Sequence, residues 1–191
     1  MPSSRLIRFL YNRLAFAYEP ILSLSARLGV SHEVHIRQQI LAQLDFPVGA
    51  RLLDLGCGTA AVRSYLPESI RYVGLDLALN MLRQGDSNKA TGSLLCADLE
   101  APPLLPQQFD VILCMGVLQH LSTPRAALRR MLPLLRPPGR ILILDEQQPL
   151  ARAFGISDNQ FADLCADLLG LPVQRTEPIY EYLLIDLARQ E

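Results

Sequence analysis

The stretch LLDLGCGTAAV, residues 52–62, decides the fold of this chain. A short apolar run ends at Gly56 and Gly58, and a helix-like segment follows, which is the order of a buried strand, a tight turn and a helix. Glycine at these positions lets the backbone approach a ligand without a Cβ in the way. Asp54 lies two residues before Gly56, at the carboxyl end of the strand, where open α/β sheets bind ligands. The pattern predicts a ligand site at this strand end.

Strand and helix patterns alternate on both sides of this turn. The predicted strands cover residues 51–55, 71–76, 93–98, 109–115 and 140–146. The predicted helices cover residues 60–65, 77–84 and 124–135, and Ser122 or Thr123 is the expected cap of the last one. Three prolines within residues 100–108 predict a loop in place of a crossover helix. This alternation predicts a doubly wound α/β fold with parallel strands and right-handed crossovers.

The two ends of the chain follow other patterns. Helical spacing of apolar residues up to Leu44 predicts a helical cap over residues 1–45, too small for a core of its own, and leaves residues 46–191 as the main domain. Near the other end, a helix capped by Ser157 is predicted over residues 157–169, followed by strands near residues 172–176 and 180–188. The gap between these strands is too short for a crossover, so we expect an antiparallel hairpin.

Composition excludes several classes of protein. The chain has 191 residues, a formal net charge of -1 and 50% hydrophobic residues. An intrinsically disordered chain would be less apolar, and a protein that holds nucleic acid by charge would be strongly basic. No run of 18 apolar residues and no secretory cleavage pattern is present, so we expect a cytoplasmic protein without a membrane-spanning helix. Its cysteines should be thiols, and the absence of a CxxC pair argues against a metal site: Cys57, Cys96, Cys114 and Cys165.

Two classes of cofactor compete for the glycine turn. Read through to Ala61, the turn fits the dinucleotide fingerprint, and Asp76 follows at the distance of a ribose-binding acid, about 20 residues further on. A pyrophosphate beside the Asp54 carboxylate would be repelled, whereas a cationic cofactor would be attracted. Asp98 ends the third strand and brings a third carboxylate to the same sheet edge. The sequence therefore predicts a nucleoside site.

Five segments resemble the class I S-adenosylmethionine-dependent methyltransferases of the small-molecule, quinone and lipid type. In chain order they are LLDLGCGTA, YVGLDLALNML, CADLEAPPL, FDVILCMGVLQHL and RPPGRILILDE. The resemblance implies a Rossmann-like seven-stranded sheet of order 3-2-1-4-5-7-6 with the last strand antiparallel. It also implies S-adenosylmethionine as cofactor and methyl transfer as reaction. The usual third glycine of the first segment is Ala60 here, and we expect its methyl group to tighten the loop without abolishing binding.

The resemblance also assigns the residues around the methionine and ribose parts of the cofactor. The backbone at Gly56, Cys57 and Gly58 borders the methionine half, next to Asp54. Asp76 takes the two ribose hydroxyls. These residues form the core of the predicted cofactor site.

The adenine and amino-acid ends are assigned in the same way. Asp98 faces the adenine amino group, the amide of Leu99 lies beside the ring, and Leu77 packs on one adenine face. Cys114 and Met115 border the amino-acid end through main-chain atoms.

The N-terminal segment YNRLAFAYEPI resembles a tyrosine-containing helix of quinone and lipid methyltransferases. In that interpretation Tyr11 and Tyr18 help to close the cofactor site. Periodicity alone indicates an amphipathic helix whose aromatics belong to the core. Arginines beside apolar residues in this segment are compatible with contact to an anionic membrane surface, and also with a solvated helix face.

Methyl transfer needs a general base only where the nucleophile must lose a proton. His120 is the best candidate because histidine titrates near neutrality, and the alternative is a histidine that packs beside the following helix. Weaker candidates are Glu146 and Tyr180. The cap contributes His32, His35 and Arg37, which we expect to be solvated or to meet a carboxylate.

Three functional hypotheses stay open from sequence. The first is methyl transfer to a small-molecule or lipid-like acceptor, favoured because the chain has no Asn/Asp-Pro-Pro-aromatic motif for an exocyclic or amide nitrogen and little length for a lid. The second is an oxidoreductase with an NAD(P) cofactor. The third is a non-catalytic cofactor-binding module of the same fold.

Overall fold

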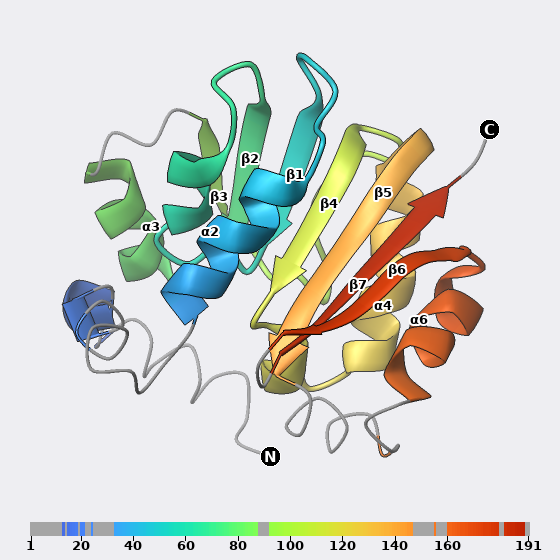
Figure 1. The fold of residues 1–191 in the computed structure, drawn as a ribbon. Coiled ribbons are helices and arrows are strands. Elements are labelled where there is room, and N and C mark those ends of the chain that lie inside the picture. The colour runs from blue at the N-terminus through green and yellow to red at the C-terminus, as the bar shows by residue number, and fades with distance from the viewer. Residues whose placement is uncertain are drawn as a thin grey trace.

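The computed structural model describes residues 13, 15–18, 20–21, 24, 33–87, 92–146, 155, 160–179 and 182–189. A seven-stranded sheet of order β3-β2-β1-β4-β5-β7-β6 forms its centre (Figure 1). The strands are β1 (Arg51–Leu55), β2 (Arg71–Asp76), β3 (Ser93–Cys96), β4 (Phe109–Met115), β5 (Leu135–Glu146), β6 (Val173–Ile179) and β7 (Tyr182–Arg189). Strands β1 to β5 run parallel, and β7 runs antiparallel to both of its neighbours, β5 and β6. The predicted α/β fold, strand order and terminal hairpin are confirmed.

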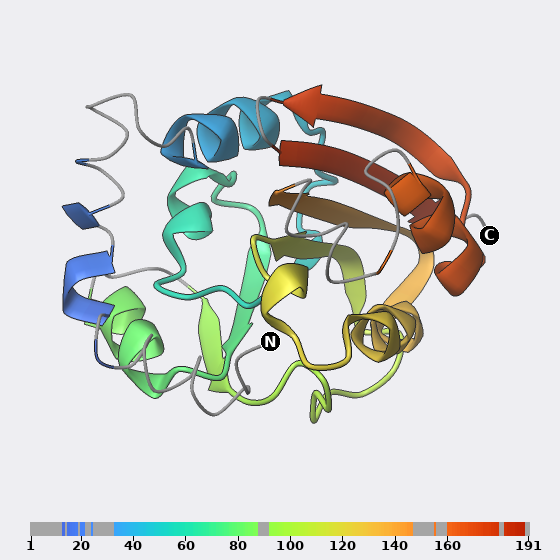
Figure 2. The ribbon, with the colours of Figure 1, turned by 90° about the horizontal axis from the view of Figure 1, so that it is seen from below.

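Helices cover both faces of this sheet. They are α2 (Glu33–Gln43), α3 (Leu79–Ser87), α4 (Pro124–Met131) and α6 (Phe161–Leu169), with 3-10 helices η1 (Ala61–Tyr65), η2 (Leu118–His120) and η3 (Leu132–Leu134). Successive residues of β1 point to opposite faces: Leu52 packs in a cluster with Leu41 of α2, and Leu53 in a cluster with Leu128 of α4. Figure 2 shows α2 and α4 on opposite sides of the strands.

Several predicted boundaries are wrong. Strand β5 begins at Leu135, five residues earlier than expected, because Leu135 pairs with Phe109 and the prolines that follow do not end the strand. The helix after the glycine turn is the 3-10 helix η1. Helix α4 ends at Met131 and passes into η3, where Pro133 lacks the N–H that a longer α-helix needs.

The cap of α4 differs from the prediction, the loop predicted before this helix agrees with it, and the last helix agrees in part. Thr123 occupies the N-cap position of α4, but its hydroxyl donates to Glu100 and accepts no hydrogen bond from an amide of the helix. The loop predicted over residues 100–108 contains no helix. Helix α6 covers the later part of the helix predicted from residue 157, and the proposed cap Ser157 lies outside the described residues.

Helix α2 is held on the sheet by apolar contacts, and the segment after it by a hydrogen bond. Its Ile36 and Ile40 are buried against Leu144 of β5 and Tyr182 of β7. Just after the helix, the carbonyl of Asp45 accepts a hydrogen bond from Arg140 Nη1 at 3.2 Å. The boundary of a separate cap at residue 45 stays a prediction.

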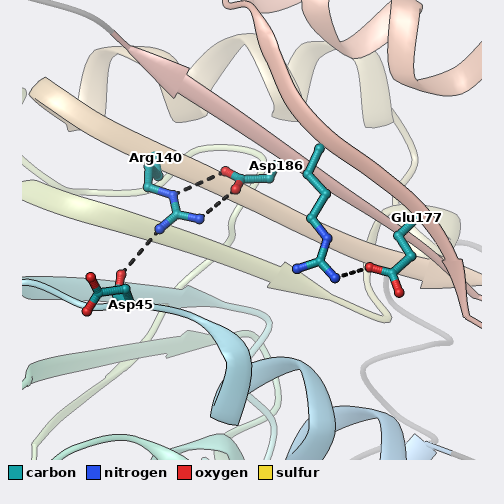
Figure 3. A network of polar contacts seen from close by, with 5 residues as sticks. Asp45, Arg140, Glu177 and Asp186 are labelled. Carbon is teal, nitrogen blue, oxygen red and sulfur yellow. Dashed lines mark hydrogen bonds and ion pairs between the residues drawn. The ribbon is translucent and has the colours of Figure 1, made fainter.

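Figure 3 shows the same Arg140 in an ion pair within the sheet. Arg140 of β5 donates from Nε and Nη2 to the two carboxylate oxygens of Asp186 on β7, at 3.2 and 2.5 Å. Asp186 is 5% exposed, and this two-point contact gives its buried carboxylate a charged partner. One guanidinium therefore joins β5, β7 and the end of α2.

All four cysteines are free thiols, as predicted. Within the part of the chain that the structure describes, no helix has the length and apolar character needed to cross a membrane.

Candidate functional site

The glycine turn after β1 is built from backbone conformations that favour glycine. Gly56 and Gly58 have φ angles of 73° and 54°. The amides of Gly56 and Cys57 both donate to the carbonyl of Leu75, at 2.7 and 3.1 Å, which fixes the turn to the end of β2. A Cβ on Gly56 would lie 2.3 Å from Cγ2 of Val117, so glycine is required there by both conformation and space.

Ala60 departs from the family pattern at a position where the backbone is also left-handed. Its φ is 54°, and the residue is 2% exposed. A left-handed conformation costs a non-glycine residue about 1–2 kcal/mol. The turn therefore retains the shape that a third glycine would give, and the cost is a local strain at Ala60.

Asp76 is held at the carboxyl end of β2 by two backbone amides. Gly58 N donates to Oδ2 at 2.8 Å and Ala78 N donates to Oδ1 at 2.7 Å. Burial raises the pKa of Asp76, and these amides oppose the shift. A carboxylate offers about four acceptor positions, so a half-buried Asp76 retains acceptor capacity for a further hydroxyl donor. The residue fits the diol of a ribose.

Asp54 lies inside the protein and faces the neighbouring strand. It is 2% exposed, and its Oδ2 accepts a hydrogen bond from the hydroxyl of Tyr72 at 2.7 Å. Burial is the main cause that raises the pKa of Tyr72, and burial together with the Asp54 charge raises that of Cys57. This buried polar group behind the turn includes Tyr72, which the sequence reasoning missed.

The residues assigned to the adenine side follow β2 and β3, which are adjacent and parallel. Asp98 is exposed, and its Oδ1 accepts a hydrogen bond from the amide of Glu100 at 2.8 Å. Leu99 is 8% exposed and belongs to the core. Leu77 is half-buried, and its carbonyl accepts a weak hydrogen bond from Cys96 Sγ at 3.8 Å. The three acidic strand ends thus share one edge, with Asp54 buried and Asp98 in solvent.

At the end of β4, Cys114 and Met115 differ in their surroundings. Cys114 is completely buried and packs in the core, where burial raises the pKa of its thiol. Met115 is half-buried beside the cluster that joins α2 to the sheet. Gly116 follows with a φ of 68°, and a Cβ there would meet no atom within 4 Å. The main chain at this position is therefore open to a ligand.

Asp145, at the end of β5, is a buried acid that the sequence reasoning missed. It is 0% exposed, and its Oδ2 accepts hydrogen bonds from Val117 N at 3.1 Å and Leu118 N at 2.9 Å. Burial raises its pKa to about 7, against the effect of these amides. The signal was present in the sequence, because Asp145 ends an apolar strand as Asp54 and Asp76 do.

His120 lies at the end of η2, close to the carboxylate of Glu146. It is half-buried, and burial lowers its pKa while the Glu146 charge raises it. The hydroxyl of Tyr182 donates to Glu146 Oε1 at 3.4 Å. These residues come from η2, β5 and β7 and form a second polar group beyond the residues assigned to the cofactor.

The remaining predicted residues lie on or near α2 and α3, or outside the residues that the structure describes. Tyr18 packs near Ala15, Ala78 and Met81, next to the helix that follows Asp76. His35 is exposed on α2, and nothing is described of the Arg37 side chain. Of the predicted site residues, Tyr11, His32 and Tyr180 lie outside the described part of the chain. Among the residues that are described, no three His, Cys, Asp or Glu side chains form a group that could hold a metal ion.

Comparison with known proteins identifies the family of this chain. Residues 53–143 match the methyltransferase domain family. A 2-phytyl-1,4-naphtoquinone methyltransferase of Thermosynechococcus vestitus is 34% identical over an alignment of 154 positions that covers 77% of this chain and 67% of that protein. A demethylmenaquinone methyltransferase of Corynebacterium urealyticum is 28% identical over 148 residues, 77% of this chain and 64% of that protein. The chain thus spans just under two thirds of the latter relative.

Solved structures give the same result for the fold. The TehB-like S-adenosylmethionine-dependent methyltransferase of Corynebacterium glutamicum superposes with a TM-score of 0.72 at 21% identity, over 92% of this chain and 98% of that one. Fold, motif order and sequence similarity agree, and the chain belongs to the class I S-adenosylmethionine-dependent methyltransferases.

Proposed function

We propose that this chain binds S-adenosylmethionine at the edge formed by β1, β2, β3 and β4. The observation that carries the proposal is Asp76, whose carboxylate is fixed by two amides and retains acceptor capacity for the ribose hydroxyls. The turn at Gly56 and Gly58 would border the methionine part, and the open main chain at Gly116 lies after the residues assigned to its amino-acid end.

The adenine would lie between Leu77 and the segment of Asp98 and Leu99. Tyr18 packs near Ala78 and Met81, directly after the ribose acid, which supports its assignment as a residue that closes the site. The residues present fit the cofactor, which supplies an activated methyl group on a sulfonium centre when bound. The protein then has to orient the acceptor in line with that group and exclude water.

The proposed acceptor is a small molecule of quinone or lipid-like character. Two relatives are methyltransferases of demethylmenaquinone and of 2-phytyl-1,4-naphtoquinone, and the near-neutral net charge suits an acceptor recognised by apolar contact. Met115, Ile36 and Ile40 form an apolar cluster on the side of the sheet that α2 covers. We assign the acceptor to this side of the cofactor residues.

We assign to His120 the role of general base for an acceptor that must lose a proton. Its lowered pKa keeps the imidazole neutral and able to accept a proton at neutral pH. The charge of Glu146 would stabilise the imidazolium that forms. Replacing His120 with Asn should lower kcat by about 100-fold or more and leave cofactor affinity unchanged. An unchanged kcat would instead indicate that His120 is a packing residue.

Calorimetry tests the cofactor assignment without knowledge of the acceptor. The chain should bind S-adenosylhomocysteine, and NADH should give no heat of binding. Binding of NADH without binding of S-adenosylhomocysteine would overturn the proposal in favour of an oxidoreductase. Transfer of a labelled methyl group to quinone and lipid fractions then separates an enzyme from a non-catalytic module.

We also propose weak contact of the N-terminal segment with an anionic membrane surface, which would bring a lipid-like acceptor near the site. Among the described residues of this segment, Phe16, Ile21 and Leu24 are more than half exposed, and Arg13 is exposed beside them. Co-sedimentation with anionic liposomes, lost when the first 24 residues are removed, would support the contact. No sedimentation at low salt would contradict it.

A further inference from the structure

We propose that Asp145 is a positioning residue: it holds the loop between β4 and η2 against the glycine turn and thereby sets the affinity for the cofactor. The inference rests on the proposed function, because it concerns the same cofactor site. Asp145 itself is 0% exposed and would not contact the cofactor. Its effect is transmitted through the backbone of the loop.

The first step is the contact between the carboxylate and the loop. Oδ2 of Asp145 accepts hydrogen bonds from two consecutive amides, Val117 N and Leu118 N, and Oδ1 accepts one from Glu146 N at 3.0 Å. Beside them, Gly116 N donates to the carbonyl of Leu144 at 2.8 Å. The whole turn after β4 is therefore fixed to the end of β5, and the carboxylate satisfies the amides of Val117 and Leu118, which lie outside the strands.

The second step is the contact between this loop and the glycine turn. The Val117 side chain fills the space where Gly56 would carry a Cβ, with Cγ2 and Cγ1 at 2.3 and 2.9 Å from that position. Val117 is 9% exposed, so its isopropyl group is packed between the loop and the turn. A shift of the Val117 backbone by a few tenths of an ångström would therefore move or loosen the turn at Gly56.

The third step is the choice of side chain at position 145. A buried carboxylate is costly unless hydrogen bonds stabilise it, and here three amides do so. Asparagine has nearly the same shape, but its NH₂ group would face an amide N–H, donor against donor, wherever its oxygen points. The change from Asp145 to Asn therefore disturbs the loop with almost no change of volume.

The experiment compares Asp145→Asn with Asp186→Asn by calorimetric titration with S-adenosylhomocysteine. Asp186 is a matched control, because it is also buried and ion-paired, but its partner is Arg140, five residues before Asp145 in the middle of β5. Asp145→Asn should weaken binding by roughly 10- to 100-fold, the loss expected for displaced hydrogen bonds to a charged group. Asp186→Asn should stay within about twofold of the wild type, although it lowers the free energy of unfolding.

The outcomes separate the two proposals. Wild-type protein that binds no S-adenosylhomocysteine would overturn the proposed function and this inference together. Wild-type binding with unchanged affinity in Asp145→Asn, or equal losses in both variants, would overturn the inference alone.

A measurement on the wild-type protein covers the case in which Asp145→Asn does not fold. The amide protons of Val117 and Leu118 should exchange slowly with solvent, and saturating S-adenosylhomocysteine should slow them by a further tenfold or more. Amides that exchange as fast as those of the exposed turn at Val48, or that do not respond to the cofactor product, would overturn the inference.

Discussion

Replacing Gly56 with alanine tests the geometry of the glycine turn most directly. The new Cβ would lie 2.3 Å from Val117 Cγ2, and the residue would have to keep a φ of 73°. The left-handed conformation costs about 1–2 kcal/mol, and overpacking of a buried contact costs about 1–3 kcal/mol. Alanine recovers about 0.4–1 kcal/mol by restricting the unfolded chain. We therefore expect the free energy of unfolding to fall by roughly 2–4 kcal/mol.

Gly49→Ala is the matched control for this variant. Gly49 has a φ of 76°, but a Cβ there would meet no atom within 4 Å, so only the conformational cost applies. Its expected loss is about 1 kcal/mol or less. Urea denaturation followed by far-UV circular dichroism measures both variants, since the chain has no tryptophan to serve as a fluorescent probe.

The contact with Val117 can be isolated by a double-mutant cycle. Val117→Ala removes the two methyl groups that meet the new Cβ, so the double variant should recover about 1–3 kcal/mol relative to the sum of the single losses. A loss in Gly56→Ala no larger than that in Gly49→Ala, or a coupling energy near zero, would refute the proposed close packing of loop and turn.

Three further predictions concern charge. Asp76→Ala should weaken binding of S-adenosylhomocysteine at least tenfold, because the ribose hydroxyls lose a charged acceptor, and wild-type affinity in calorimetry would reject the assignment. The pKa of Asp145 is raised to about 7, so the native state binds more protons than the unfolded state between about pH 4 and pH 7. Over this range wild-type stability should fall with rising pH, relative to Asp145→Asn, by up to about 1.4 kcal/mol per pH unit. Parallel urea-denaturation profiles of the two proteins would contradict this sign. Arg140→Met should lower the free energy of unfolding by roughly 1–3 kcal/mol, because the buried Asp186 loses its partner, and thermal melting at unchanged temperature would argue against that role.

The strands could be predicted best where local signals coincide. The bounds predicted for β1, β2 and β4 match those of the structure, because each is a short apolar run that ends at a glycine, an acid or a turn. Strand β5 was predicted too short, since Pro137 and Pro138 read as a turn although their strand continues through them. Pairing with β4 decides that start, and pairing is not visible in a local pattern.

The candidate site could be predicted where its residues follow one another in a motif. The glycine turn and Asp76 are linked by the offset that ribose-binding sites use, and the structure joins them through Gly58 N. The position of Asp145 at the end of an apolar strand is visible in the sequence, but its contacts are not, because its partners, Val117 and Leu118, lie more than 25 residues earlier and contribute only backbone amides. A backbone donor leaves no residue type in the sequence to recognise.

The four cysteines differ in exposure, so the wild-type protein can be labelled with a fluorescent dye at a single site. Cys96 is exposed at the end of β3, whereas Cys57, Cys114 and Cys165 are buried. A maleimide dye under native conditions should therefore label one thiol, two residues before Asp98 and in contact with the carbonyl of Leu77. A fluorophore attached there would sense occupation of the adenine side, so cofactor affinity and release could be followed in real time without mutagenesis.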